Sequence, residues 1–188
     1  MKASVGIGTL GLMAAFAAPA HAEQALVAAQ SEISFTSRQM GVSLDGTFKT
    51  FSAQIQFDPN KPEASRIALT IDLSSATIGD AETTAELAKP TWFDSKRVPQ
   101  ATFLSASVKA DGPGQFDVTG QLVIKGHQRE VRVPVTLTQA AGRSTAVGRF
   151  VIKRLDFRIG DGEWADTSML ANDVQVKFKL VLTGVGAL

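Results

Sequence analysis

Histidine and cysteine, which often serve as general base and nucleophile, are scarce or absent in this 188-residue chain. It contains no cysteine and two histidines. His21 lies in an N-terminal leader-like segment, and His127 follows a glycine in "IKGHQRE", which predicts a solvated residue at a hairpin turn. No GxSxG motif frames a serine. The sequence therefore favours a protein that is not an enzyme, and a zinc or copper site built on imidazole or thiolate ligands is not expected.

The acidic stretch "DGEWAD" is the best candidate for a hard-cation site. Asp161, Glu163 and Asp166 could offer oxygens to calcium, but their spacing fits no EF-hand loop, and Asp-Gly is ordinary turn chemistry. The same carboxylates could form an acid–base pair, with no better support. We therefore expect a turn here, with no metal and no cofactor.

The first 22 residues, "MKASVGIGTLGLMAAFAAPAHA", have the pattern of a cleaved secretory signal peptide. Lys2 precedes an apolar run from Val5 to Ala18, and Ala20-His21-Ala22 forms a small-x-small cleavage site. The run is short for a bilayer span, and no cysteine follows that could anchor a lipoprotein. Residues 23–188 are then expected to form a single secreted domain.

The charge of the mature chain excludes one class of partner. Without Lys2, 18 basic and 18 acidic residues balance, and the Lys and Arg residues are scattered. A nucleic-acid partner is therefore not expected. The chain must also fold without disulfides.

Period-two alternation of apolar and polar residues dominates the mature chain. About eight strands are predicted, most with one apolar face: 33–36, 51–57, 67–73, 102–108, 116–124, 131–137, 146–153 and 174–182. Such strands bury their apolar faces by pairing with a second sheet or by closing on themselves. About eight antiparallel strands suit an all-β barrel, with an interior that is filled by side chains or holds one small ligand.

Two segments depart from simple alternation. Phe48 and Phe51 have opposite parity, so either the strand shifts phase near Lys49-Thr50, as at a β-bulge, or Phe48 faces outward. The segment 79–99 predicts a short helical insertion, with Asp80 as the N-cap and Pro90 as the stop.

The aromatic residues are the strongest remaining signal. The chain has eleven Phe, two Trp and no Tyr, so almost all of its aromatic surface lacks a polar group. A packed core is the ordinary interpretation of such a composition, and composition alone favours it over a ligand cavity.

Four motifs, in order along the mature chain, resemble the YceI family. They are "GTFKTFSAQIQFDPNKPEAS" (46–65), "ELAKPTWFDSKRVPQATFLSASV" (86–108), "VTGQLVIKGHQREVRVPVTL" (118–137) and "RLDFRIGDGEWADTSMLANDVQVKFKLVL" (154–182). The resemblance covers essentially all of the mature chain. It implies a lipocalin-like antiparallel β-barrel in the periplasm, with an apolar channel for an isoprenoid lipid such as an isoprenoid quinone or a polyprenyl phosphate.

The chain departs from the family at two polar positions. Many relatives carry H-x-G where this chain has Gln39-Met40-Gly41, and many carry an Arg-Asp and His-Leu run where this chain reads "AETTAEL". If those polar residues hold a headgroup, the headgroup preference of this chain is open. The "GEWAD" loop resembles a subgroup associated with a membrane-bound b-type haem cytochrome, which would suit a quinone ligand.

With this resemblance, a ligand cavity is favoured over a packed interior. Strand parity then predicts the residues that line the channel, and a one-residue register error would invert the assignment of any strand. They are Phe35, Phe51, Ile55, Phe57, Leu69, Ile71, Phe103, Phe150 and Phe178. Trp92 and Phe93, on the irregular segment between helix and strand, are expected at the mouth, although they could instead only pin that loop onto the barrel.

The resulting hypothesis is a non-enzymatic periplasmic carrier or store for an isoprenoid lipid. The alternative is an interaction module that supports a membrane b-type cytochrome and quinone redox system without catalysis of its own. An enzyme acting on a lipid pyrophosphate lacks a catalytic constellation, and a purely structural role would require a filled interior. A homodimer stays open.

Overall fold

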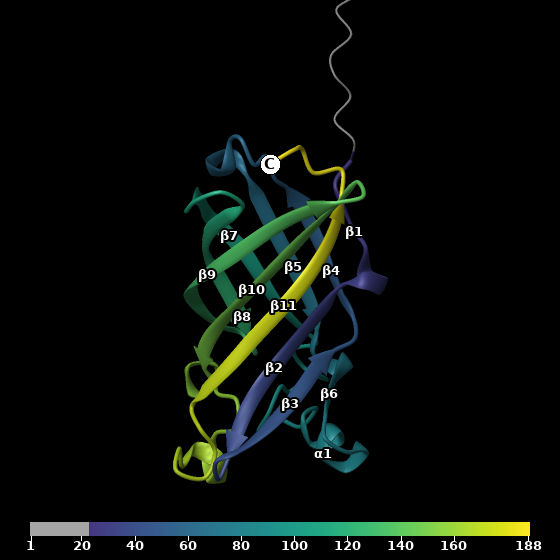
Figure 1. Ribbon diagram of the computed structural model, residues 1–188. Coiled ribbons are helices and arrows are strands. Elements are labelled where there is room, and N and C mark those ends of the chain that lie inside the picture. The colour runs from purple at the N-terminus through teal and green to yellow at the C-terminus, as the bar shows by residue number, and fades with distance from the viewer. Residues whose placement is uncertain (1–22) are drawn as a thin grey trace, which may run out of the picture.

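The structure is a computed structural model that describes residues 23–188 (Figure 1), so the predicted signal peptide at 1–22 lies outside the described residues. Its strands are β1 Ala25–Leu26, β2 Glu32–Gln39, β3 Val42–Phe48, β4 Phe51–Gln56, β5 Arg66–Asp72, β6 Ala76–Ile78, β7 Gln100–Ala110, β8 Gln115–Ile124, β9 His127–Ala140, β10 Arg143–Lys153 and β11 Asp173–Thr183. The helix α1 spans Ala81–Glu86, and 3-10 turns lie at η1 Ala28–Gln30, η2 Pro62–Ala64, η3 Leu73–Ser75, η4 Arg154–Phe157 and η5 Gly162–Ala165.

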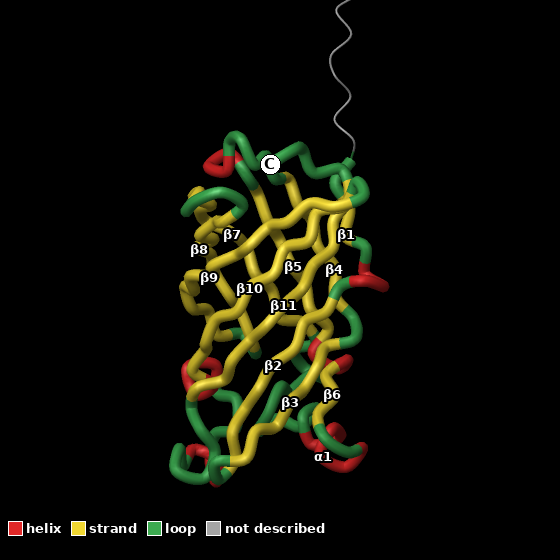
Figure 2. Tube along the Cα trace, in the orientation of Figure 1, coloured by secondary structure: helices red, strands yellow, loops and turns green. Residues whose placement is uncertain are grey.

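The strands form one antiparallel sheet that curls into a barrel, which confirms the predicted fold class. Segments 42–56 and 66–78 are two long, bent strands that pair with each other as β3–β6 and β4–β5. From them the pairing continues through β3 to β2 and through β5 to β7, and β7 to β11 follow in sequence back to β2. The hydrogen-bonded circuit therefore passes around the whole wall (Figure 2).

All eight predicted strands are present, each longer than or close to its predicted range. The β8–β9 connection is a two-residue hairpin at Lys125 and Gly126, both with positive φ (52° and 77°). Such a pair is typical of a type I′ turn. His127 begins β9 directly after it and is half-buried.

The phase shift predicted near Lys49-Thr50 is a real break between β3 and β4. Both Phe48 and Phe51 pack against the core, so the alternative in which Phe48 faces outward is wrong. The backbone amide of Lys49 donates to Ser75 and that of Asp72 donates to Thr50, so the bend in one long strand is matched by a bend in its partner. The matched bends allow the sheet to turn without losing its pairing.

Helix α1 forms where the sequence predicts it. The Asp80 carboxylate accepts a hydrogen bond from the Thr83 amide at 2.8 Å, as expected of an N-cap. This backbone hydrogen bond lowers the pKa of Asp80. Helix α1 and η5 lie at the end of the barrel opposite the chain's C-terminus (Figure 1). Among the described residues, no helix has the length and apolar character needed to cross a membrane.

Candidate functional site

The barrel encloses a cavity of about 590 Å³. Every strand from β2 to β11 contributes to its wall. Most of the lining side chains are aliphatic or aromatic. Its volume lies within the range of about 300–1,000 Å³ that is usual for small-molecule sites. The interior is therefore hollow as well as apolar.

Ten of the eleven residues predicted to contact a ligand lie on this wall: Phe35, Ile55, Phe57, Leu69, Ile71, Trp92, Phe93, Phe103, Phe150 and Phe178. Phe51 is the exception, and the expectation for it is corrected. It begins β4 directly after the break, opposite Ile71, and is a half-buried neighbour of the core that does not line the cavity. Parity places a residue on a face of the sheet, but at a bend it does not fix how far the side chain reaches inward.

Three of the predicted phenylalanines lie flat over glycines of the neighbouring strand. A Cβ built on Gly46 would lie 2.2 Å from the Phe35 ring, one on Gly120 2.5 Å from Phe103, and one on Gly148 2.4 Å from Phe178. The glycines thus leave room in the wall for rings that would otherwise project into the centre. This arrangement explains how a phenylalanine-rich interior keeps a cavity.

The polar side chains of the wall gather near α1. They include Ser37 and Gln39 at the end of β2 and Glu82, Thr83 and Glu86 on α1. Glu82 and Thr83 are exposed to solvent, whereas the other lining residues are buried or half-buried. The cavity therefore reaches solvent beside α1.

Two tryptophans cover this open end. The rings of Trp92 and Trp164 lie 5.5 Å apart, and both line the cavity. The neighbouring Phe93 is buried, with its ring 6.4 Å from that of Phe35 and 5.8 Å from that of Phe48. The aromatic pair 92–93 thus both faces the cavity and fastens its loop to the barrel. Trp164 was missed, although a large ring in the otherwise polar "GEWAD" turn is the same signal that singled out Trp92.

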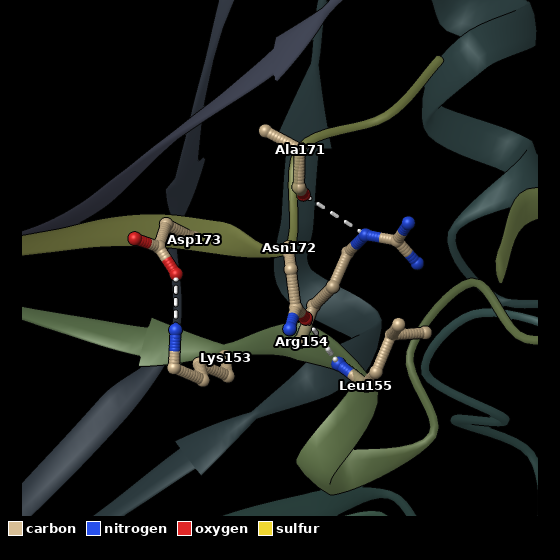
Figure 3. A network of polar contacts seen from close by, with 6 residues as sticks. All are labelled: Lys153, Arg154, Leu155, Ala171, Asn172 and Asp173. Atoms are coloured by element: carbon tan, nitrogen blue, oxygen red, sulfur yellow. Dashed lines mark hydrogen bonds and ion pairs between the residues drawn. The ribbon is translucent and has the colours of Figure 1, made fainter. Parts of the chain in front are cut away.

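Arg154 binds the backbone of the loop that carries Trp164. Its side chain is 1% exposed, and its N–H groups donate to five backbone carbonyls, those of Ile159, Gly160, Trp164, Leu170 and Ala171, at 2.5–3.0 Å. The bond to Ala171 is visible in Figure 3. Burial lowers the pKa of Arg154.

The role of Arg154 also escaped sequence reasoning. Phe150, Ile152 and Arg154 alternate along the chain and all face the cavity. A cation that follows two inward-facing apolar residues in this alternation could have indicated a buried arginine. All five N–H groups of a guanidinium are used here, and the residue therefore organises the loop that carries Trp164.

The carboxylates of the acidic loop Asp161–Asp166 do not converge on one point. Among residues 23–188, no three His, Asp or Glu side chains converge as metal ligands would. The Asp166 carboxylate instead accepts hydrogen bonds from the Ser168 hydroxyl at 2.6 Å and the Ser168 amide at 2.8 Å. The hydroxyl contact is the main reason that the pKa of Asp166 is lowered. Local turn chemistry therefore accounts for this carboxylate.

An antiparallel barrel that surrounds an apolar cavity and opens at one end is a lipocalin-like fold. The YceI-like domain matches residues 25–182, and the chain belongs to that family.

Solved structures and curated relatives agree with this assignment. The barrel superposes on BcnA of Burkholderia cenocepacia with a TM-score of 0.80 and 44% identity, over 83% of this chain and 98% of that one. A polyisoprenoid binding domain from Saccharophagus degradans shares the fold at a TM-score of 0.69 and 19% identity, over 86% of this chain and 98% of that one. Protein YceI of Escherichia coli O157:H7 is 38% identical over 106 residues, which are 56% of this chain and 53% of that protein. The chain thus spans about half the length of the curated relatives it matches.

Proposed function

We propose that this protein is a periplasmic, non-enzymatic carrier that holds one isoprenoid lipid in the barrel cavity. The observation that supports this most directly is the cavity itself, about 590 Å³ in volume and walled almost entirely by apolar side chains from ten strands. A branched, flexible hydrocarbon chain suits such a wall because burial is non-directional. The polyisoprenoid binding domain of Saccharophagus degradans shares this fold, although at its low identity the likeness extends to the fold alone.

The energetics of the proposal are adequate. Burial of hydrocarbon contributes about 0.8 kcal/mol per CH₂, so several five-carbon units would exceed the cost of ordering the chain. The predicted signal peptide supports the periplasmic location, and the lack of cysteine and the single histidine of residues 23–188 support a role without catalysis.

The test is native mass spectrometry of protein purified from a periplasmic extract, followed by organic extraction of what it carries. An adduct whose extracted lipid shows isoprene mass steps is the expected result. A protein that is free of lipid, and that also fails to take up ubiquinone offered in detergent, would contradict the proposal.

Adjacent residues of β10 provide a matched pair of variants. Ala146 lines the cavity, whereas Val147 is 40% exposed on the outer face. Ala146→Trp should fill part of the cavity and reduce the lipid content, and Val147→Trp should leave it unchanged. Equal lipid content in the two folded variants would place the ligand outside the barrel.

The same pair distinguishes the alternative of an interaction module for a membrane b-type cytochrome. A module that does not need the cavity would still retain such a cytochrome from detergent-solubilised membranes when it carries Ala146→Trp.

A further inference from the structure

The cavity wall is polarised along the barrel axis. Near α1 it carries Ser37, Gln39, Glu82 and Glu86, whereas at the other end buried apolar residues such as Phe57, Phe116 and Leu182 form the wall. If the protein carries an isoprenoid lipid, as proposed above, the hydrocarbon tail occupies the apolar end. The headgroup then lies at the mouth beside α1.

The charges at the mouth do not suit an anion. Within the described chain, the charged side chains on the wall are Glu82, Glu86 and Arg154. Every N–H of Arg154 already donates to a backbone carbonyl, so its charge faces carbonyl dipoles and no donor remains for a phosphate oxygen. Glu86 forms an ion pair with the exposed Lys89, and no ion pair joins Glu82 to any residue in 23–188.

Neutral donors are present at the same end. No hydrogen bond links the side chains of Ser37, Gln39, Trp92 or Trp164 to another residue of the described range, and all four line the cavity. A hydroxyl, an amide and two indole N–H groups can donate to the carbonyl or hydroxyl oxygens of an uncharged headgroup. A phosphate would instead require cationic donors to replace its hydration.

We propose that the mouth selects isoprenoid lipids with neutral headgroups, and that Glu82 and Glu86 on α1 reject anionic ones. Lys89 offsets part of the charge of Glu86, so the repulsion of a phosphate comes mainly from Glu82 and to a smaller extent from Glu86. This repulsion should weaken binding of the phosphate about tenfold at low salt. The difference in affinity between neutral and anionic lipids should narrow as ionic strength rises, because these carboxylates are accessible to solvent. These two residues are then specificity determinants of the lipid site.

The test compares two ligands that share one tail, a long-chain polyprenol and its monophosphate, in equilibrium binding to lipid-free protein in dilute detergent. The polyprenol should bind about tenfold more tightly than its phosphate. Phosphate that binds as tightly as the polyprenol, or more tightly, would overturn the selectivity while leaving the carrier function intact. Failure of both ligands, and of ubiquinone, would overturn the carrier function and the selectivity with it.

A double variant separates charge from shape. Glu82→Gln with Glu86→Gln keeps the size of both side chains and should raise affinity for the phosphate about tenfold while affinity for the polyprenol stays constant. Glu63→Gln, an exposed change on η2, is the matched control and should alter neither affinity. An unchanged ratio of the two affinities in the double variant would show that these glutamates do not set the preference.

Discussion

Replacement of Arg154 by Met is the perturbation for which the structure gives the clearest expectation. Met keeps the unbranched apolar stem and removes the guanidinium. Five backbone carbonyls between Ile159 and Ala171 then lose their donors. These carbonyls belong to the loop that holds Trp164 against Trp92 at the mouth.

The magnitude follows from the number of acceptors left unpaired. A buried carbonyl without a donor costs about 1–3 kcal/mol, so five that stayed dry would remove most of the stability of an ordinary domain. The loop will therefore open and let water reach most of them, and we expect a net loss of about 3–5 kcal/mol. For a domain of this size that corresponds to a fall in Tm of roughly 10 °C or more. Arg154→Lys keeps a charge but at most three donors, and it should lose less, about 2 kcal/mol.

The assay is urea unfolding followed by tryptophan fluorescence, with amide hydrogen exchange of residues 159–171 as a local measure. Arg149→Met, an exposed change on β10, the strand that ends directly before Arg154, is the control and should stay within about 0.5 kcal/mol of the parent. If Arg154→Met were as stable as this control and its loop equally protected from exchange, Arg154 would not have the role given to it here. If the Met variant does not fold, the same comparison is made with Arg154→Lys.

Two further predictions concern the wall and acid stability. Gly46→Ala should push the Phe35 ring into the cavity, because the added Cβ would lie 2.2 Å from that ring, and should reduce bound lipid more than it reduces Tm; unchanged lipid uptake would contradict this. Hydrogen bonds lower the pKa values of Asp80 (from the Thr83 amide), Asp117 (from the Arg132 side chain) and Asp166 (from the Ser168 hydroxyl) below the ordinary 3.8. These carboxylates contribute to the stability of the fold above their unfolded-state pKa, and the contribution is lost as the pH falls through their lower folded-state pKa values. Unfolding midpoints in urea should therefore decline below about pH 4 and be nearly flat from pH 5 to 7.

Much of the wall could be predicted because its strands are long and one-faced. In 116–124 and 174–182, alternation allows only one face of the strand to bury the apolar residues, and in the barrel that face points inward. The α1 N-cap at Asp80 was equally accessible, because capping depends only on neighbours in sequence.

Strand β3 was harder to identify because of Asp45 and Gly46. These residues have the composition of a turn, yet they lie within the strand, where Gly46 accommodates the Phe35 ring from β2. The contact between Gly46 and Phe35 depends on the tertiary structure, so no periodic pattern in the sequence reveals it. Strand β6, with three residues, is too short to show a period at all. The role of Arg154 was equally hard to predict, because its five hydrogen-bond acceptors come from a loop whose path the sequence does not reveal.

The hollow interior itself illustrates why composition favoured the wrong interpretation. Counting phenylalanines measures how much apolar surface must be buried, but the radius of a closed barrel is set by its strands and their register. A hydrogen-bonded circuit cannot shrink onto its contents without breaking pairs, so side chains fill only the outer part of the space. Phe35, Phe103 and Phe178 lie against glycines of adjacent strands, which brings the rings closer to the wall still. The cavity is thus a property of strand closure combined with three glycine positions, and substitutions at those glycines will control its volume more directly than substitutions of the rings.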